Sequence, residues 1–215
     1  MAPLALFDLD NTLVDRVATF KRWAVSFSDQ RGLDPEAVVW LCEADGDGFT
    51  NRRDIFVGAR DRFGLRDSAD DLVSAYWNEY VSFYRPDPAV INAITRLREA
   101  GWKTAVITNG PPTQHEKVSR SGLLGLFDAY CVSEEIGAQK PDIRIFTEAF
   151  RRCGYVQGDV GWMIGDTAEP DIGGGISAGL KTIWIHRGRE WSVDRYRPDA
   201  QAGTIEEAVD ILLAP

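Results

Sequence analysis

The feature that most constrains the fold is a series of short apolar runs, each of which stops at a polar or small residue. Runs of this length bounded by Gly, Asp or Asn are typical of buried strands. Between the later runs, apolar residues recur at the spacing of amphipathic helices, as in Val90, Ile91, Ile94 and Leu97. Strands that alternate with helices imply a parallel sheet with helices on both sides. The expected strands are 4–7, 104–107, 130–132, 160–164 and 182–185.

The segment 16–85 interrupts this alternation. It carries two apolar stripes at helical spacing and no convincing strand between them. We therefore predict an α/β fold in two parts. Residues 1–15 and 86–215 form a core domain with a Rossmann-like parallel sheet, and residues 16–85 form a small α-helical cap domain inserted after the first strand. Trp23, Trp40 and Trp77 are expected to build the core of the cap.

Charge and cysteine content exclude several classes of protein. The chain has 33 acidic and 24 basic residues, a formal charge of −9, so its long-range field repels nucleic acid and anionic lipid. No run of about 18 apolar residues is present to span a membrane. Cys42, Cys131 and Cys153 are an odd, scattered set, which predicts reduced, buried thiols in a cytoplasmic protein. The sequence does not indicate an oligomeric state.

Polar side chains follow several of the expected strands. In an open parallel sheet, ligands bind beyond the carboxyl ends of the strands. Four segments bring chemically useful side chains to that edge: Asp8 and Asp10, Thr108 and Asn109, Lys140, and Asp166. Lys140 is followed by Pro141, which suits the first turn of a helix. A sheet of this type would gather these groups in one pocket.

Three carboxylates in one pocket require a cation, because like charges at close range raise each other's pKa. Mg²⁺ fits best, since it prefers oxygen ligands and is commonly shared between carboxylates and a substrate phosphate. Zn²⁺ is disfavoured because neither His115 nor His186 stands in a ligand-like motif. Lys140, the hydroxyl of Thr108 and the backbone N–H groups of residues 108–110 would then hold an anion opposite the metal, most simply a phosphoryl group.

These residues resemble the four motifs of the haloacid dehalogenase superfamily of phosphohydrolases. The motifs correspond to Asp8-Leu-Asp10-Asn-Thr12, Thr108-Asn109-Gly110, Lys140-Pro141 and Gly165-Asp166-Thr167-Ala-Glu-Pro-Asp171. They occur in the family's order and span most of the core. The position of the helical insert is similar to that of the cap in the family's C1 subclass.

The resemblance implies a role for each motif residue. Asp8 would be the nucleophile that forms an aspartyl-phosphate, and Asp10 would protonate the leaving alcohol and then deprotonate water. Asp8, Asp166 and the backbone carbonyl of Asp10 would hold Mg²⁺. Asp171 is either a supporting metal ligand or a residue that caps the following helix. Thr108, Asn109 and Lys140 would bind the phosphoryl group, and Thr12 would orient Asp10.

The expected activity is Mg²⁺-dependent hydrolysis of a small phosphorylated metabolite. The dehalogenase branch of the superfamily lacks an acid at the position of Asp10, which favours a phosphatase here. A phosphomutase of the same superfamily keeps the same core residues and stays an alternative. Another is a non-enzymatic module, either a phospho-aspartate signalling domain or a phosphometabolite sensor, which would not need Asp10 to protonate a leaving group. The sequence does not identify the ester.

Overall fold

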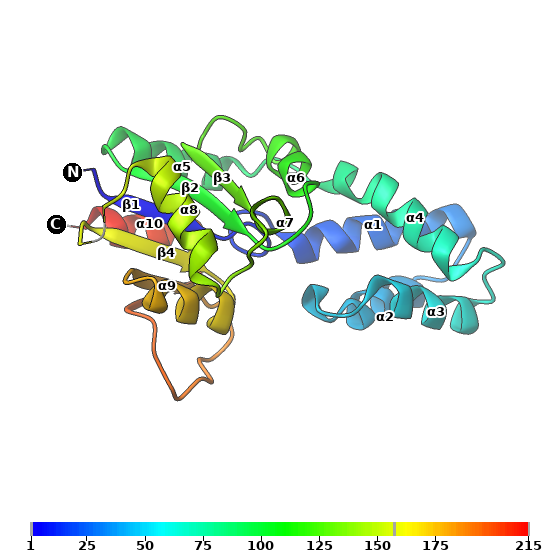
Figure 1. Cartoon of the computed structure of the whole chain (residues 1–215). Helices are drawn as coiled ribbons and strands as arrows, with labels where there is room; N and C mark the ends of the chain where they lie inside the picture. Colours follow the sequence, from blue (N-terminus) through cyan, green and yellow to red (C-terminus); the bar gives the residue numbers. More distant parts are fainter. Residues whose placement is uncertain (1, 157, 215) are drawn as a thin grey trace. The chain divides into compact units, whose positions relative to one another are not determined.

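A computed structural model describes residues 2–156 and 158–214. The chain forms two compact units (Figure 1). One unit comprises Asp15–Arg85, and the other runs up to Val14 and resumes at Pro86. The first is entirely helical and the second contains all the described strands.

The strands of the second unit form one parallel sheet with the order β3-β2-β1-β4-β5-β6. This confirms the predicted α/β fold with a Rossmann-like sheet. Each expected strand is present, and no strand end differs from the expected one by more than one residue. The strands are β1 Leu4–Phe7, β2 Lys103–Thr108, β3 Ala129–Val132, β4 Gly161–Gly165, β5 Lys181–Ile185 and β6 Ala200–Ala202. The edge strand β6 was not predicted, because Ala-Gln-Ala carries no apolar run.

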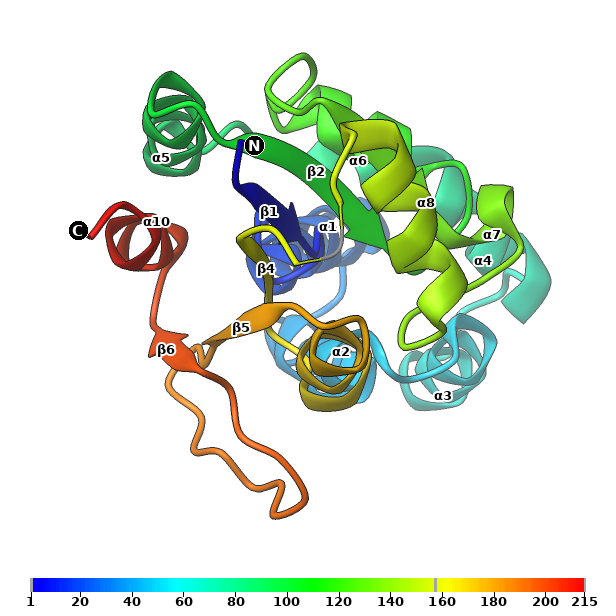
Figure 2. The same cartoon turned by 60° about the vertical axis from the view of Figure 1, so that its left-hand side comes forward.

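Helices cover both faces of the sheet. On one face, α8 (Ile143–Cys153) buries Ile145, Phe146 and Ala149 in a cluster with residues of β1 to β4. On the other face, α5 (Pro88–Glu99) packs against α10 (Ile205–Leu213) (Figure 2). The remaining helical segments of this unit are α6 Gln114–Arg120, α7 Ser133–Ile136, the π-helical turn η3 Ala168–Gly173, and α9 Gly174–Ser177. Over the described ranges, none of the helices has the length and apolar character needed to cross a bilayer.

The register of the central strands sets where the chemistry collects. Phe7 at the end of β1 is level with Val106 in β2 and with Ile164 in β4. The N–H of Asp8 then donates to the carbonyl of Ile164 at 2.9 Å. The residues that follow β1, β2 and β4 therefore leave the sheet side by side at one edge, which is where a strand order of this kind places a binding crevice.

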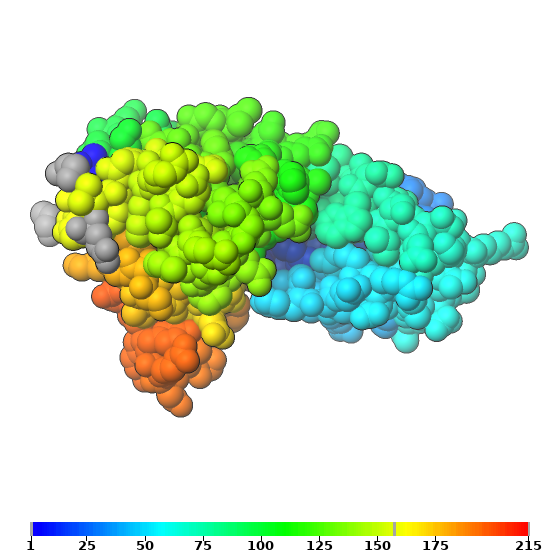
Figure 3. Space-filling view, viewed as in Figure 1, coloured from blue at the N-terminus to red at the C-terminus, as the bar shows by residue number. Residues whose placement is uncertain are grey.

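The segment 186–199, which joins β5 to β6, protrudes from the sheet unit (Figure 3). Its outer part is held by aromatic contacts, with ring centroids 5.0 Å apart for Trp184 and Trp191 and 5.9 Å apart for Trp191 and Tyr196. It returns to the sheet at Asp199, whose carboxylate accepts from the N–H of Thr182 at 2.8 Å. This contact positions β6 beside β5.

The helical unit is built around aromatic side chains. Trp23 is buried, and its ring centroid lies 4.9 Å from that of Tyr76 and 5.7 Å from that of Phe56. The prediction for Trp77 was wrong, since that residue is 47% exposed. Its helices are α1 Arg16–Arg31, α2 Glu36–Asp45, α3 Arg52–Phe63 and α4 Ala69–Glu79, with short 3₁₀ turns η1 Gly46–Gly48 and η2 Tyr80–Phe83. Side-chain oxygens of Asp15, Asn51 and Ser68 cap α1, α3 and α4 by accepting N–H groups of the first turn.

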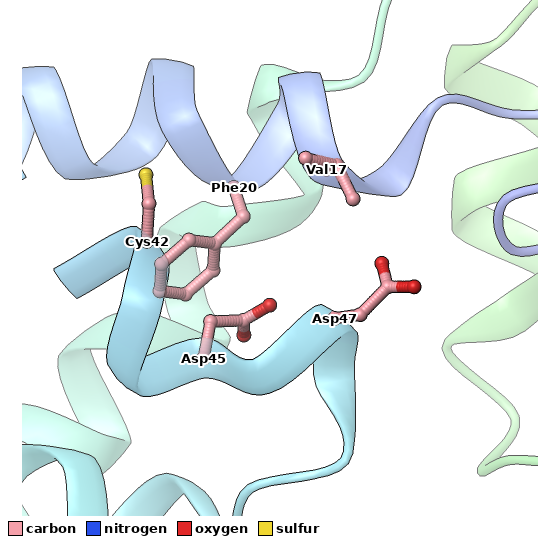
Figure 4. A pocket seen from close by; sticks show the side chains of 5 residues that line it. All are labelled: Val17, Phe20, Cys42, Asp45 and Asp47. Carbon is pink, nitrogen blue, oxygen red and sulfur yellow. The ribbon is translucent and has the colours of Figure 1, made fainter. Parts of the chain in front are cut away.

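A buried ionic cluster lies inside the helical unit. Two guanidinium nitrogens of Arg16 donate to the carboxylate of Asp45 at 2.7 and 2.8 Å, and Arg52 donates to the same carboxylate at 2.5 Å. Burial alone would raise the pKa of Asp45, but the hydrogen bonds and charges of the two arginines outweigh it and lower that pKa. Beside this cluster is a hollow of about 260 Å³ (Figure 4), lined by Val17, Phe20, Cys42, Asp45 and Asp47.

The three cysteines are free thiols. Cys131 on β3 is buried, as expected, and burial raises the pKa of its thiol to about 11. Cys42 and Cys153 are only partly buried, so the expectation that all three are buried packing residues was wrong.

Candidate active site

Lys140 is the centre of the predicted site. Its side chain is 2% exposed, and its Nζ donates to Asp8 Oδ1 at 2.6 Å and to Asp171 Oδ1 at 2.7 Å. The three residues come from the end of β1, the segment before α8 and the turn η3 after β4. Charge-assisted hydrogen bonds of this length are strong in a buried setting. The structure thus joins three of the predicted segments through one ammonium group.

The carboxylates of this site form a cluster suited to a cation. One side-chain oxygen each from Asp8, Asp166 and Asp171 lies within 4.8 Å of the others, and all three residues are buried. Lys140 contacts the carboxylates of Asp8 and Asp171, and two arginines described below contact that of Asp166. Carboxylate oxygens are the donors that Mg²⁺ prefers. The donor set therefore fits a divalent cation, and it brings in Asp171, for which the sequence left a helix-capping role equally open.

Burial shapes the ionisation of the cluster. It raises the pKa of Asp8 to about 8, although Lys140 acts in the opposite direction. It also raises the pKa of Asp166, with the charge of Asp171 adding to the effect. Lys140 loses solvation as well, but the two neighbouring carboxylates keep its pKa above the ordinary value. Asp8 and Asp166 thus bind a proton more readily than ordinary aspartates, and a further positive charge nearby would oppose this.

Gly165 makes room for Asp171. A Cβ atom at position 165 would collide with the carboxyl group of Asp171. Without a side chain at the end of β4, the Asp171 carboxylate lies against the strand and accepts the N–H of Thr167 at 2.9 Å. Position 165 therefore has to be glycine, because the carboxyl group of Asp171 lies too close to its backbone for a side chain to fit.

Two arginines of the segment after β5 contact Asp166. Arg187 Nη1 lies 3.2 Å and Arg189 Nη2 lies 3.0 Å from Asp166 Oδ2. The backbone carbonyl of Asp166 also accepts from Arg189 at 2.7 Å and from Trp184 Nε1 at 2.9 Å. These contacts fix both the backbone and the carboxylate of Asp166. None of these three residues was singled out from the sequence, because they lie outside the recognised motifs.

Asn109 connects the segment after β2 to the segment that carries Lys140. Its amide nitrogen donates to the backbone carbonyl of Lys140 at 3.0 Å, and its amide oxygen accepts the backbone N–H of Lys140 at 2.8 Å. Asn109 was predicted to bind phosphate, and here its side chain holds the lysine backbone at both of its polar groups. The N–H of Gly110, expected to point at the anion, donates to Ser133 Oγ at 2.9 Å.

Asp10 is held from α6. Lys117 Nζ donates to Asp10 Oδ2 at 2.6 Å, and Gln114 Nε2 donates to the same oxygen at 3.1 Å. Gln114 Nε2 also donates to Thr108 Oγ1 at 2.7 Å. Neither Gln114 nor Lys117 belongs to a motif recognised in the sequence. The available signal was their three-residue spacing on a short helix directly after Thr-Asn-Gly, which places both on one helical face.

Thr12 was predicted to orient Asp10, but no hydrogen bond of the Thr12 hydroxyl in the described part of the chain supports that role. Its side chain is buried, and the Oγ1 atom makes no hydrogen bond with any residue that the structure describes. The loop after β1 is closed by backbone bonds instead, with the N–H of Asn11 donating to the carbonyl of Val14 at 2.8 Å. Asp10 is thus positioned from α6, with no contact from the Thr12 hydroxyl.

Comparison with known sequences gives a family and several relatives. A family of hydrolases described as haloacid dehalogenase-like matches residues 3–179. A glyceraldehyde 3-phosphate phosphatase of Methanopyrus kandleri is 34% identical over 145 residues, which are 65% of this chain and 62% of that protein. The match to the Methanopyrus kandleri phosphatase and the match to the pyrimidine 5′-nucleotidase YjjG of Escherichia coli each span less than two thirds of the relative's length. A glyceraldehyde 3-phosphate phosphatase of Pyrococcus abyssi is 29% identical over 99% of this chain and 93% of its own length.

Solved structures share the fold over nearly the whole chain. The hydrolase YfnB of Bacillus subtilis, solved with bound magnesium, has a TM-score of 0.76 at 24% identity and covers 99% of both chains. A phosphatase of the same superfamily from Thermococcus onnurineus has a TM-score of 0.64 at 26% identity and covers 99% of this chain and 98% of its own. The 2-haloacid dehalogenase of Pseudomonas syringae has a TM-score of 0.62 at 28% identity, with the same coverage.

Proposed function

Because the chain belongs to the haloacid dehalogenase-like hydrolases, we propose that it hydrolyses phosphate monoesters of small metabolites through a phosphorylated Asp8. The observation that carries this proposal is the ammonium group of Lys140 between Asp8 and Asp171, 2.6 and 2.7 Å from their carboxylate oxygens. A nucleophilic carboxylate beside a buried cation is arranged to receive a phosphoryl group, since the cation offsets the charge of both. We also propose that Asp15–Arg85 is the cap and the sheet unit is the catalytic core.

In the first half-reaction, a carboxylate oxygen of Asp8 attacks phosphorus and the ester P–O bond breaks. Asp10 gives its proton to the departing oxygen, so that the alcohol leaves neutral. The hydroxyl of Thr108 and the ammonium of Lys140 stabilise the phosphoryl oxygens as charge builds on them. Asn109 keeps Lys140 in place through its two hydrogen bonds to the lysine backbone.

In the second half-reaction, water attacks the same phosphorus. Asp10, now a carboxylate, takes the proton of the water, and the bond between phosphorus and Asp8 breaks to release inorganic phosphate. One residue thus serves as acid and then as base, which returns the site to its starting protonation state. The net reaction consumes one water and one ester and yields one alcohol and one phosphate.

We propose Mg²⁺ as the cofactor. Asp8, Asp166, Asp171 and the backbone carbonyl of Asp10 would hold it, and YfnB, a relative in fold, was solved with magnesium. When bound, the ion would offset the negative charge of the substrate phosphate together with that of the carboxylates. Arg187 and Arg189 would keep the carboxylate of Asp166 oriented toward it.

Hydrolysis of 4-nitrophenyl phosphate tests this proposal. We expect turnover that stops in EDTA and returns with Mg²⁺, and no turnover by Asp8→Asn with the fold intact by circular dichroism. Asp142→Asn, at the partly exposed N-cap of α8, is the matched control and should retain wild-type rates, because Asn also caps a helix. Undiminished turnover after chelation would remove the metal from the mechanism, and an active Asp8→Asn would remove the nucleophile.

Two enzymatic alternatives, a dehalogenase and a phosphomutase, differ from a phosphatase in their substrates and products. A dehalogenase needs no proton donor for its leaving halide, whereas Asp10 is present here with two N–H donors on its carboxylate. We therefore expect no halide release from 2-chloropropionate. A phosphomutase would return the phosphoryl group to a second hydroxyl and release no inorganic phosphate. A screen of phosphorylated metabolites that scores free phosphate and kcat/KM separates these reactions and ranks substrates.

The relatives suggest which esters belong in that screen. Their names give glyceraldehyde 3-phosphate, pyrimidine nucleotides and phosphoserine as substrates of those proteins. All are small, anionic metabolites with a phosphate monoester. We propose a substrate of this class and a cytoplasmic location for the enzyme.

A further inference from the structure

Resting on the proposed function, we propose that Lys117 and Gln114 are positioning residues, which hold the acid–base carboxylate of Asp10 and direct the hydroxyl of Thr108. Both residues project from α6, and both donate to the same atom, Asp10 Oδ2, at 2.6 and 3.1 Å. They lie 107 and 104 positions from Asp10 along the chain, so the contacts are made by the fold and not by local sequence.

Gln114 links the two halves of the chemistry. Its Nε2 group has two hydrogens, and its two contacts are Asp10 Oδ2 at 3.1 Å and Thr108 Oγ1 at 2.7 Å. The orientation of the amide follows from Asp10, because the amide oxygen would repel a carboxylate oxygen at this distance. Thr108 Oγ1 must therefore accept from Gln114. The hydrogen of the Thr108 hydroxyl is then directed to another acceptor, and a phosphoryl oxygen of the substrate is such an acceptor.

The two donors also select the oxygen of Asp10 that exchanges protons. Two N–H groups directed at Oδ2 require its lone pairs, so a proton on Oδ2 would displace one of them. The geometry points to Oδ1 as the atom that gives the proton to the leaving group and later takes one from water. Lys117 and Gln114 thereby fix the plane of the Asp10 carboxylate through Oδ2.

The surroundings of α6 are built for this arrangement. Gln114 is 2% and Lys117 is 8% exposed, which is unusual burial for such polar side chains. A Cβ at position 110 would approach Gln114 Cδ to 3.0 Å, and the backbone there has a φ of +153°. Gly110, the last residue of the Thr-Asn-Gly motif, therefore makes room for the Gln114 amide. The motif serves two purposes: Thr108 contacts substrate, and Gly110 admits the residue that orients Thr108.

The test compares esters whose leaving groups differ in their need for a proton. The constant kcat/KM reports steps up to phosphorylation of Asp8, so it isolates the acid role of Asp10. For Lys117→Met we expect kcat/KM for glycerol 3-phosphate, an alkyl ester, to fall by about 10- to 100-fold, part of the 10²–10⁴ that a general acid contributes. For 2,4-dinitrophenyl phosphate, whose phenolate leaves without a proton, the loss should stay below about threefold. Lys103→Met, on an exposed lysine, is the control and should leave both values unchanged.

A double-variant cycle separates positioning from general damage. Once Asp10→Asn has removed the acid, adding Lys117→Met should cost less than about threefold more, because residues that act through one group are not additive. Gln114→Met provides a second variant. Its kcat/KM should also fall more for the alkyl ester than for 2,4-dinitrophenyl phosphate, because Gln114 contacts Asp10. In addition, kcat/KM should fall for both esters, because Gln114 also orients the hydroxyl of Thr108. Equal losses for the two esters in the folded variants, or a full additional loss in the Asp10→Asn background, would overturn the inference. Failure of the wild type to hydrolyse any ester would instead overturn the proposed function itself.

Discussion

Replacing Lys140 by Met should destabilise the metal-free protein strongly. The ammonium group contacts two carboxylates at 2.6 and 2.7 Å, and the three side chains are 2%, 12% and 1% exposed. Removing one partner of a buried ion pair costs about 3–5 kcal/mol, because it leaves an uncompensated buried charge. Here two carboxylates lose the same partner, with Asp166 nearby. We therefore expect a loss of about 4 kcal/mol in the free energy of unfolding near pH 8.

The size of this loss should depend on pH. The carboxylates of the variant can escape part of the penalty by binding a proton, and burial already raises the pKa of Asp8 to about 8 in the presence of Lys140. Lys140 lowers the pKa of Asp8, so without it the folded variant keeps this proton to a higher pH than the folded wild type does, and its stability falls more steeply as pH rises. The deficit relative to wild type should thus be larger near pH 8 than near pH 6. Added Mg²⁺ should reduce it by supplying positive charge.

Urea unfolding in EDTA, followed by far-UV circular dichroism at both pH values, measures the deficit. Lys103→Met is the matched control, since Lys103 also contacts an aspartate, at 3.1 Å, but its side chain is 48% exposed. Exposed pairs contribute about 0–1 kcal/mol. A Lys140→Met variant that loses no more than this control, or that loses the same amount at both pH values, would refute the reasoning.

Three further predictions concern the acid, the metal and the helical unit. Asp10→Asn should lower kcat/KM for alkyl phosphates by about 10²–10⁴-fold, measured by steady-state assay on protein whose fold is verified by circular dichroism; a wild-type rate would exclude Asp10 as the acid. Mg²⁺ should bind at least about tenfold more tightly near pH 8 than near pH 6 in calorimetric titrations, because the raised pKa of Asp8 makes a proton compete with the ion, and a pH-independent affinity would contradict this. Asp45→Asn should destabilise the protein by about 3–5 kcal/mol in urea by removing the negative charge that faces the guanidinium groups of Arg16 and Arg52, whereas Asp70→Asn, in an exposed pair, should cost less than about 1 kcal/mol; equal costs would argue against the buried cluster.

Much of the sheet could be predicted because its strands are buried on both faces. Such strands are nearly continuous apolar runs, and each of the five predicted ones is present. The edge strand β6 lacks that signal: Ala-Gln-Ala becomes a strand through pairing with β5 and through the contact of Asp199 with Thr182. Trp77 fails for a related reason, because an aromatic residue at helical spacing can also lie on the solvent side.

The site divides in the same way. Residues at or just after the strand ends could be brought together from topology, since the register of β1, β2 and β4 places Asp8, Thr108 and Asp166 at one edge of the sheet. Contacts made by side chains from other elements could not. Lys117 looks like any lysine on an amphipathic helix, and its contact with Asp10 depends on where α6 lies. The roles assigned to the motif residues stay predictions until the variants are measured.

The reciprocal bonds between the Asn109 amide and the Lys140 backbone have a consequence for anyone who redesigns this enzyme. Two hydrogen bonds join the loop of Asn109 to the loop of Lys140, 31 positions later in the chain. If either loop were transferred alone to another scaffold, the Lys140 backbone would lose the two hydrogen bonds that position it, so both loops have to be transferred together.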